Sequence, residues 1–223
     1  MAQRSLRLLV TALVVVLCSA PACRRIGQAH RFVFIDGGAH FGESYVAFRK
    51  TGLYSKYPWE IIAIEANPTL AARLPQGRDV TLMSKAIWVT DGTLTFHMES
   101  DTSGANSIFD RFKENATALT VPSFDFSQWL MKTVTADDYV ILSMDIEGAE
   151  YDVIDKMLKD GSFKNVDRFY VEFHPYLLTD VPRNQADKRS RTLLREVEKL
   201  GLIVADDSAE GVMKRGDWID FLL

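Results

Sequence analysis

Cysteine is almost absent from this chain of 223 residues. Its only two cysteines, Cys18 and Cys23, both lie within the first 25 residues. A disulfide framework, a cysteine-rich zinc site and a thiol nucleophile are therefore excluded from the rest of the chain. The length is sufficient for one domain with a substantial buried core.

Clustered positive charge is also lacking. The net charge is −4, and the 26 lysines and arginines are spread along the sequence. Binding to a nucleic-acid backbone needs a concentrated basic face. The composition therefore predicts no nucleic-acid partner.

The first 25 residues differ from everything that follows. Two arginines precede an apolar run over residues 8–17, and Ala20-Pro21-Ala22 then places small residues before Cys23. These are the three parts of a secretory signal peptide. Alternatively, the segment is an uncleaved anchor that associates with the membrane through residues 6–23, or another targeting sequence or a misassigned start. We expect the secretory pathway or a membrane-anchored location rather than the cytoplasm, and a folded domain over residues 31–223.

Apolar runs and helix-like segments alternate along this domain. The runs cover residues 32–35, 61–64, 80–88, 139–142 and 169–171, and the helical patterns cover 41–50, 149–158 and 186–200. Short runs that are apolar throughout are typical of strands covered by helices on both faces. The alternation predicts an α/β fold with a mainly parallel sheet.

Two further segments carry β signals. Residues 88–96 form two β-like arms about Asp91-Gly92, which predicts a hairpin. Residues 202–205 and 218–223 are expected to form a closing pair of strands.

A glycine-rich turn follows the first predicted strand. It reads Asp36-Gly37-Gly38-Ala39-His40-Phe41-Gly42 and leads into a helix. Glycines let the backbone approach a ligand closely, and the N–H groups of a helix start favour a negative group. Asp36 is an acceptor suited to an ammonium group or an ordered water. The alternative is a tight turn that needs glycine for its shape alone.

An acid ends the second predicted strand, in Ile64-Glu65-Ala66-Asn67-Pro68. A carboxylate at this place can accept hydrogen bonds from ribose hydroxyls, as in dinucleotide folds. Together with the glycine turn, Glu65 predicts a cofactor that contains adenosine, with Asn67 counted in the same site.

Acids also follow the fourth predicted strand, as Asp145, Glu147 and Glu150, and His174 follows the fifth together with Glu172. Ligands of open α/β sheets bind outside the carboxyl ends of the strands. Asp145 and Glu147 should therefore face the cofactor crevice, where they can take a proton, fix a hydroxyl or hold a metal. Glu150 is expected to be the first-turn acid that favours a helix N-terminus.

These motifs resemble the FkbM family of methyltransferases. FIDGGAHFGES, AIEANP, AIWVTDGTLTF, SMDIEGAEYDVI and VEFH occur in the family's order over nearly all of residues 31–223. The resemblance implies a Rossmann-like class I methyltransferase, with a mainly parallel seven-stranded sheet, an antiparallel last strand and helices on both faces. It also implies S-adenosylmethionine as cofactor and transfer to an oxygen, often of a sugar or polyketide.

The resemblance assigns roles to individual residues. Asp36, Gly37, Gly38, His40 and Gly42 fall in the cofactor loop, Glu65 binds the ribose, and Asp145 and Glu147 lie near the transferred methyl. Two positions depart from the family pattern: His40 stands where asparagine is usual, and Ser143 where a lysine is frequent. The first alters contacts to the methionine part of the cofactor, and the second alters the charge balance of the site.

The expected reaction is attack of a substrate hydroxyl, on a small molecule or a glycan, at the sulfonium methyl. Our candidates for the base are His174 first, then Asp145 or Glu147. A divalent metal bridging the acids would serve the same purpose. Two alternatives are a noncatalytic binding protein on the same scaffold and a nicotinamide-dependent oxidoreductase, although Ala39 stands where the oxidoreductase turn usually has glycine.

Overall fold

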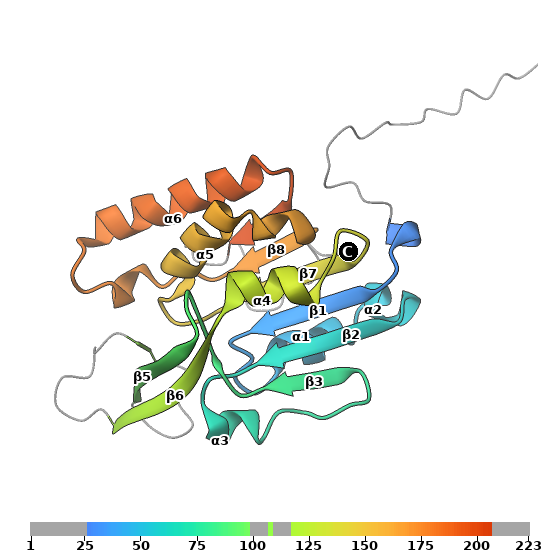
Figure 1. Cartoon of the computed structure of the whole chain (residues 1–223), viewed down its shortest axis with the longest axis horizontal. Helices are drawn as coiled ribbons and strands as arrows, with labels where there is room; N and C mark the ends of the chain where they lie inside the picture. Colours follow the sequence, from blue (N-terminus) through green and yellow to red (C-terminus); the bar gives the residue numbers. More distant parts are fainter. Residues whose placement is uncertain (1–25, 99–106, 109–116, 207–223) are drawn as a thin grey trace, which may run out of the picture.

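The computed structural model describes residues 26–98, 107–108 and 117–206 (Figure 1). Six strands form one sheet in the order β3-β2-β1-β7-β8-β9, and all neighbouring strands in it are parallel. Their bounds are β1 Phe32–Gly37, β2 Trp59–Ile64, β3 Val80–Met83, β7 Tyr139–Met144, β8 Arg168–Val171 and β9 Ile203–Asp206. The two central strands, β1 and β7, are buried over their whole length, as their apolar runs predict.

Helices cover both faces of this sheet (Figure 1). On one face α4, α5 and α6 pack over Val33, Ile35 and the inner residues of β7 and β8. On the other face α1 packs over Phe34, whose ring stacks on that of Phe48. The helices are α1 Glu43–Phe48, α2 Gly52–Lys56, α3 Pro68–Ala71, α4 Phe126–Thr133, α5 Glu150–Asp160 and α6 Arg183–Glu198, with short 3-10 helices η1 Ile26–Gln28, η2 Ser162–Asn165 and η3 Pro175–Leu177.

A second, three-stranded sheet has the order β4-β6-β5. It consists of β4 Ala86–Trp88, β5 Gly92–Met98 and β6 Thr117–Asp125. The predicted hairpin about Asp91-Gly92 is wrong, because β6 lies between the two arms. β6 pairs with β5 along all seven residues of β5, whereas β4 is only three residues long and would pair with β5 over a much shorter length. The predicted strand 80–88 is likewise two strands, one in each sheet.

The predicted fold class, a mainly parallel α/β sheet with helices on both faces, is confirmed. Residues 218–223, which were expected to supply the antiparallel last strand, lie outside the described residues, as does the N-terminal segment 1–25. The first helix is shorter than expected: it ends at Phe48, and Gly52 begins α2, with the Thr51 side chain as its N-cap. Among the described residues, no helix has the length and apolar character needed to span a membrane.

Candidate functional site

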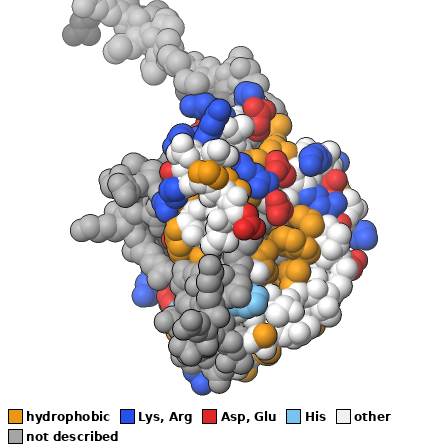
Figure 2. Space-filling model, turned by 90° about the vertical axis from the view of Figure 1, so that its left-hand side faces the viewer, with side chains coloured by type: hydrophobic (Ala, Val, Ile, Leu, Met, Phe, Trp, Pro, Cys, Tyr) orange, Lys and Arg blue, Asp and Glu red, His pale blue; other side chains and the backbone are white. Residues whose placement is uncertain are grey.

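The candidate site lies at the carboxyl edge of the large sheet. Because β1, β2, β7 and β8 are parallel, the segments that follow them meet at this edge. Figure 2 views the molecule from this side and shows acidic side chains beside apolar ones. The predicted residues of the glycine turn, the strand-end acids and His174 all belong to these segments.

The glycine turn is held between β2 and the segment after β7. The backbone N–H groups of Gly38 and Ala39 both donate to the carbonyl of Ile64, at 2.9 and 3.0 Å. Gly38 has a φ of 83°, and a Cβ added there would lie 1.7 Å from the carbonyl oxygen of Asp145. Only glycine fits this crossing, since the position requires a left-handed backbone and leaves no space for a side chain.

Glu65 fixes the same turn through its carboxylate. Oε2 accepts the backbone N–H of His40 at 2.9 Å, and Oε1 accepts that of Asn67 at 2.8 Å. Burial raises the pKa of Glu65, against the effect of these hydrogen bonds. Each carboxylate oxygen can accept a second hydrogen bond, so the ribose role and the turn-fixing role are compatible. The Asn67 side chain caps α3 by accepting the N–H of Thr69.

Asp36 lies on the α1 side of the sheet. It is 1% exposed, and among the described residues its Oδ2 has no hydrogen-bond partner. Burial raises the pKa of Asp36 to about 7, against a backbone hydrogen bond from Tyr45, and the charges of Glu43 and Glu65 raise it further. A buried acceptor without a donor is uncommon and indicates a place for a ligand or water.

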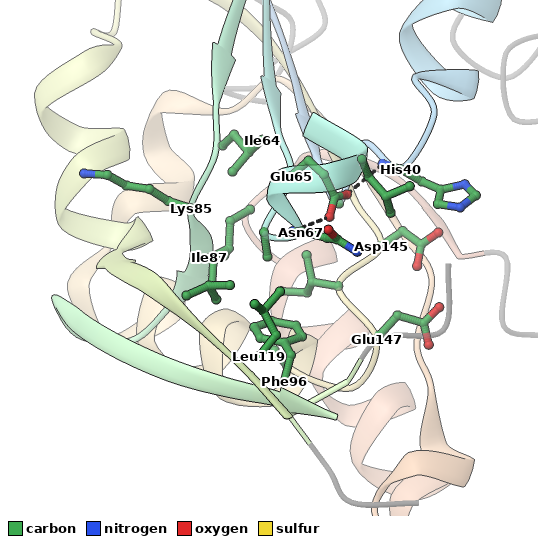
Figure 3. Close-up of a pocket in the computed structure, with 17 residues that line it drawn as sticks. His40, Ile64, Glu65, Asn67, Lys85, Ile87, Phe96, Leu119, Asp145 and Glu147 are labelled. Atoms are coloured by element: carbon green, nitrogen blue, oxygen red, sulfur yellow. Dashed lines mark hydrogen bonds between the residues drawn. The ribbon is translucent and has the colours of Figure 1, made fainter. Parts of the chain in front are cut away.

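A cavity of about 280 Å³ opens between the two sheets. Figure 3 shows its polar side, with Glu65, Asn67 and Asp145, and its apolar side, with Ile87 and Leu119. A few polar groups facing an apolar wall are typical of a cofactor pocket. The lining residues are Gly38, His40, Ile64, Glu65, Ala66, Asn67, Leu70, Lys85, Ala86, Ile87, Phe96, Leu119, Val121, Asp145, Ile146, Glu147 and Ala149.

Of the predicted cofactor residues, Gly38, His40, Glu65 and Asn67 line this cavity. Gly37, Gly42 and Asp36 do not: Gly37 lies against Ile87 and the Ser143 carbonyl, and Gly42 lies against the Tyr45 ring. The His40 backbone is left-handed, with a φ of 49°, and its Nδ1 lies 3.1 Å from Oε1 of Glu43.

His174 stands behind the cavity, surrounded by acids. It is 3% exposed, and its Nδ1 lies 2.9 Å from Oε1 of Glu150. Its Nε2 lies 3.5 Å from Asp145 Oδ1, and slightly farther from oxygens of Glu172 and Glu147, at 3.7 and 3.8 Å. Asp145 and Glu147 therefore both line the cavity and lie close to the His174 imidazole.

The carboxylates around His174 raise its pKa, and burial raises that of Asp145. Burial lowers the pKa of His174, but the hydrogen bond and charge of Glu150, together with the charges of Asp145 and Glu147, raise it to about 10. Burial raises the pKa of Asp145 well above its ordinary value; the charge of His174 opposes this, and the neighbouring acids add to it. A raised pKa makes the ionised Asp145 carboxylate a stronger base than an ordinary aspartate.

The same cluster also offers metal ligands. Asp145, Glu150 and His174 each offer one ligand atom, and these three atoms lie within 4.8 Å of one another. Both oxygens of Glu150 already accept backbone N–H groups, those of Ile146 and Gly148, each at 2.9 Å. Oε1 also faces Nδ1 of His174, whereas Oε2 keeps a lone pair that a metal could use.

Two parts of the site are not apparent in the sequence. Glu150 is in the first turn of α5, as expected, but it is fully buried and holds both His174 and the preceding turn. Ser107 is also fully buried, and its hydroxyl donates to the carbonyl of Glu147 at 2.7 Å. The third acid of Asp-Ile-Glu-Gly-Ala-Glu was the only signal for Glu150, and no signal identified Ser107.

The parallel α/β sheet, with a glycine turn and strand-end acids around one cavity, is a Rossmann-like arrangement of the kind that binds a nucleotide-type cofactor. The family model of the FkbM methyltransferase domain matches residues 36–197, well over half of the chain. The chain therefore belongs to the FkbM methyltransferase family, as the sequence motifs predicted. No curated protein and no solved structure matches it.

Proposed function

We propose that the protein transfers the methyl group of S-adenosylmethionine to a hydroxyl oxygen of a sugar, a glycan or another small molecule. The observation that carries this proposal is the cavity itself. It brings the glycine turn, Glu65 and Asp145 together in a domain of a methyltransferase family. Membership of that family supports methyl transfer, and the geometry suggests how the chain's residues contribute.

The residues present fit S-adenosylmethionine. Glu65 offers free lone pairs to ribose hydroxyls, and the apolar wall around Ile87 and Leu119 suits an adenine ring. Asp36 is a buried carboxylate with an unused oxygen, which an ammonium group or an ordered water can satisfy. When bound, this cofactor supplies a methyl group that is already activated by the sulfonium charge.

Asp145 is our candidate for the base. An aliphatic hydroxyl is a weak nucleophile and must lose its proton as the new bond to carbon forms. Asp145 lines the cavity, and burial raises its pKa. His174 does not line the cavity, and a pKa of about 10 leaves it protonated at neutral pH, without a lone pair to take a proton. We assign to Glu147, which also lines the cavity, the role of fixing the acceptor hydroxyl.

Positioning adds to the effect of the base. Holding two reactants in line can contribute about 7–11 kcal/mol, and a general base contributes roughly 10²–10⁴-fold. The turn that carries Asp145 and Glu147 is suited to positioning a substrate because it is fixed. Glu147 has a left-handed backbone with a φ of 52°, its carbonyl accepts the Ser107 hydroxyl, and the N–H of the next residue donates to Glu150.

A divalent metal at Asp145, Glu150 and His174 would act instead by lowering the pKa of the hydroxyl. A chelator separates the two mechanisms. Activity that falls on chelation and returns with Mg²⁺ or Mn²⁺ supports the metal, and activity that is unchanged supports Asp145 as the base.

We also propose that residues 1–25 direct the chain to the secretory pathway or anchor it in a membrane. Their basic start and apolar run support this proposal. A fusion to a reporter should give either a product shortened to near Cys23 or a full-length membrane-bound form. Uncleaved protein in the cytosol would contradict both.

The experiment for the proposed function uses the full chain, methyl-labelled S-adenosylmethionine and a cell extract. We expect the label to appear in a fraction that contains hydroxylated small molecules or glycans. Asp145→Asn should reduce transfer by at least roughly tenfold and preserve cofactor affinity. The matched control Asp137→Asn changes an exposed acid and should transfer as the wild type does. No transfer to any fraction would contradict the proposal.

A further inference from the structure

The backbone N–H groups of the glycine turn, from residue 38 to residue 42, all donate to acceptors within the protein. These bonds run from Gly38 and Ala39 to the Ile64 carbonyl, from His40 to Glu65 Oε2, from Phe41 to Glu43 Oε2 and from Gly42 to the Ala39 carbonyl. The sequence predicted that N–H groups at this helix start favour a negative group. In the structure these five groups are already bonded, so a carboxylate at the turn needs another donor.

The turn also carries one side-chain nitrogen that can serve as this donor. Nε2 of His40 is shielded from solvent and has no hydrogen-bond partner among the described residues. His40 lines the cavity, and Figure 3 shows its ring on the same side of the pocket as Asp145, with Lys85 on the opposite side. A buried polar atom without a partner indicates a place for a ligand or water.

Two neighbours hold the imidazole of His40. Its Nδ1 lies 3.1 Å from Oε1 of Glu43, and the Phe41 ring packs against it with 4.1 Å between the ring centroids. A carboxylate can only accept hydrogen bonds, so Nδ1 carries the proton of the neutral ring, and Nε2 becomes a donor when the ring takes up a second proton. A carboxylate at Nε2 favours this protonated form, because opposite charges stabilise each other.

The charges around the cavity favour a carboxylate over an ammonium group at Nε2. Glu65, Asp145 and Glu147 line the cavity, so the cationic groups of S-adenosylmethionine have acidic side chains near them. Basic side chains are scarce: among the described residues that line the cavity they are His40 and Lys85. The carboxylate of the cofactor therefore has few possible partners, and His40 is the one that belongs to the turn.

We propose that His40 binds the carboxylate of S-adenosylmethionine through Nε2, and that Glu43 is a positioning residue that holds the imidazole for this contact. The side chain of the turn, rather than its backbone, then makes the site selective for the amino-acid end of the cofactor. The inference rests on the proposed function, because it takes S-adenosylmethionine to be the ligand.

The test compares calorimetric binding of S-adenosylmethionine and of decarboxylated S-adenosylmethionine to the full chain. The measured quantity is the ratio of the two affinities, because the difference in charge between the compounds is the same for every variant. His40→Asn should lower this ratio roughly tenfold or more, since a charge-assisted hydrogen bond is lost. Asparagine tolerates the left-handed φ of 49° and can still contact Glu43, but its amide ends short of the Nε2 position.

A second variant and a matched control accompany this measurement. His40→Gly also keeps the left-handed backbone and should lower the ratio as much as His40→Asn does. His30→Asn changes an exposed histidine that does not line the cavity and should leave the ratio at the wild-type value. An unchanged ratio in either folded His40 variant would overturn the proposal. A ratio that falls in Lys85→Ala and not in the His40 variants would place the carboxylate at Lys85 and overturn it as well.

The role of Glu43 is tested by the same ratio. Glu43→Gln should lower it about threefold, as expected for a partly exposed ion pair, and should leave the affinity for the decarboxylated compound within about twofold of the wild type. An equal loss for both compounds would show that Glu43 only supports the turn and would overturn its positioning role.

The outcomes for the wild type separate this inference from the proposed function. Binding of both compounds, with a ratio that the His40 variants do not change, would overturn the inference alone. Binding of neither compound would overturn the proposed function and the inference with it.

Discussion

The buried carboxylate of Asp36 should make the protein less stable at neutral pH than a neutral side chain would. The residue is 1% exposed, its Oδ2 has no hydrogen-bond partner among the described residues, and burial raises its pKa to about 7 from an ordinary 3.8. In Asp36→Asn the amide has the same shape, its oxygen can still accept the N–H of Tyr45, and no charge is buried. This substitution therefore separates the cost of the charge from the packing of the site.

The magnitude follows from the two pKa values. The difference between 3.8 and about 7 corresponds to about 4 kcal/mol between the protonation states. Because the folded-state pKa is raised, the contribution to stability is present below the unfolded pKa and is lost as the pH rises through about 7. Local relaxation of the structure reduces the free-energy cost of burying the Asp36 charge. We expect Asp36→Asn to gain about 1–3 kcal/mol over the wild type near pH 8 and no more than about 0.5 kcal/mol near pH 4.

The assay is urea unfolding of the full chain, followed by circular dichroism near pH 4, 6 and 8. Asp137→Asn, at an exposed acid, should stay within about 0.5 kcal/mol of the wild type at each pH. In parallel, if the ammonium group of S-adenosylmethionine reaches the free Oδ2, Asp36→Asn should bind the cofactor more weakly, because hydrogen bonds to a charged group contribute about 1.5–3 kcal/mol. A stability difference that does not change with pH would refute the reasoning about burial, and unchanged affinity would remove Asp36 from the cofactor site.

Three other substitutions test the turn and its supports. Glu65→Gln should weaken S-adenosylmethionine binding by about 1.5–3 kcal/mol in calorimetry, since a hydrogen-bonded charge is lost; normal affinity in a folded variant would contradict the ribose role. Gly38→Ala should lose cofactor binding and unfold at lower urea than Gly161→Ala, because Gly161 has a similar φ of 71° but nothing within 4 Å of an added Cβ; equal losses would show that the contact with the Asp145 carbonyl is unimportant. Ser107→Ala should cost about 0.5–1.5 kcal/mol of stability and slow methyl transfer without changing cofactor affinity, because the Glu147 turn loses a hydrogen bond; an unchanged transfer rate would exclude that support.

The large sheet could be predicted because its strands are apolar throughout and its helices are periodic. The same periodicity could not place the short strands. β4 and β5 carry a hairpin signal, but their partner β6 comes from residues 117–125, and pairing between distant segments leaves no trace in local sequence. For that reason the apolar wall of the cavity, with Leu119 and Val121, was not anticipated.

The candidate site, like the fold, could be predicted only in part. Parallel strands bring their carboxyl ends together, so the meeting of Asp36, Glu65, Asp145 and His174 at one edge follows from topology. Which of these residues faces the cavity does not, because it depends on side-chain direction within the turns. Sequence alone made His174 the first candidate for the base. In the structure His174 is paired with the buried Glu150 and is not among the residues that line the cavity, and neither feature can be read from the sequence.

The central claim, that the cavity between the two sheets binds S-adenosylmethionine, is tested most directly by calorimetric titration of the full chain with that cofactor, and with NAD in a parallel experiment. We predict binding of S-adenosylmethionine at one site per chain and no heat from NAD. Binding of NAD, or of neither compound, would contradict the account.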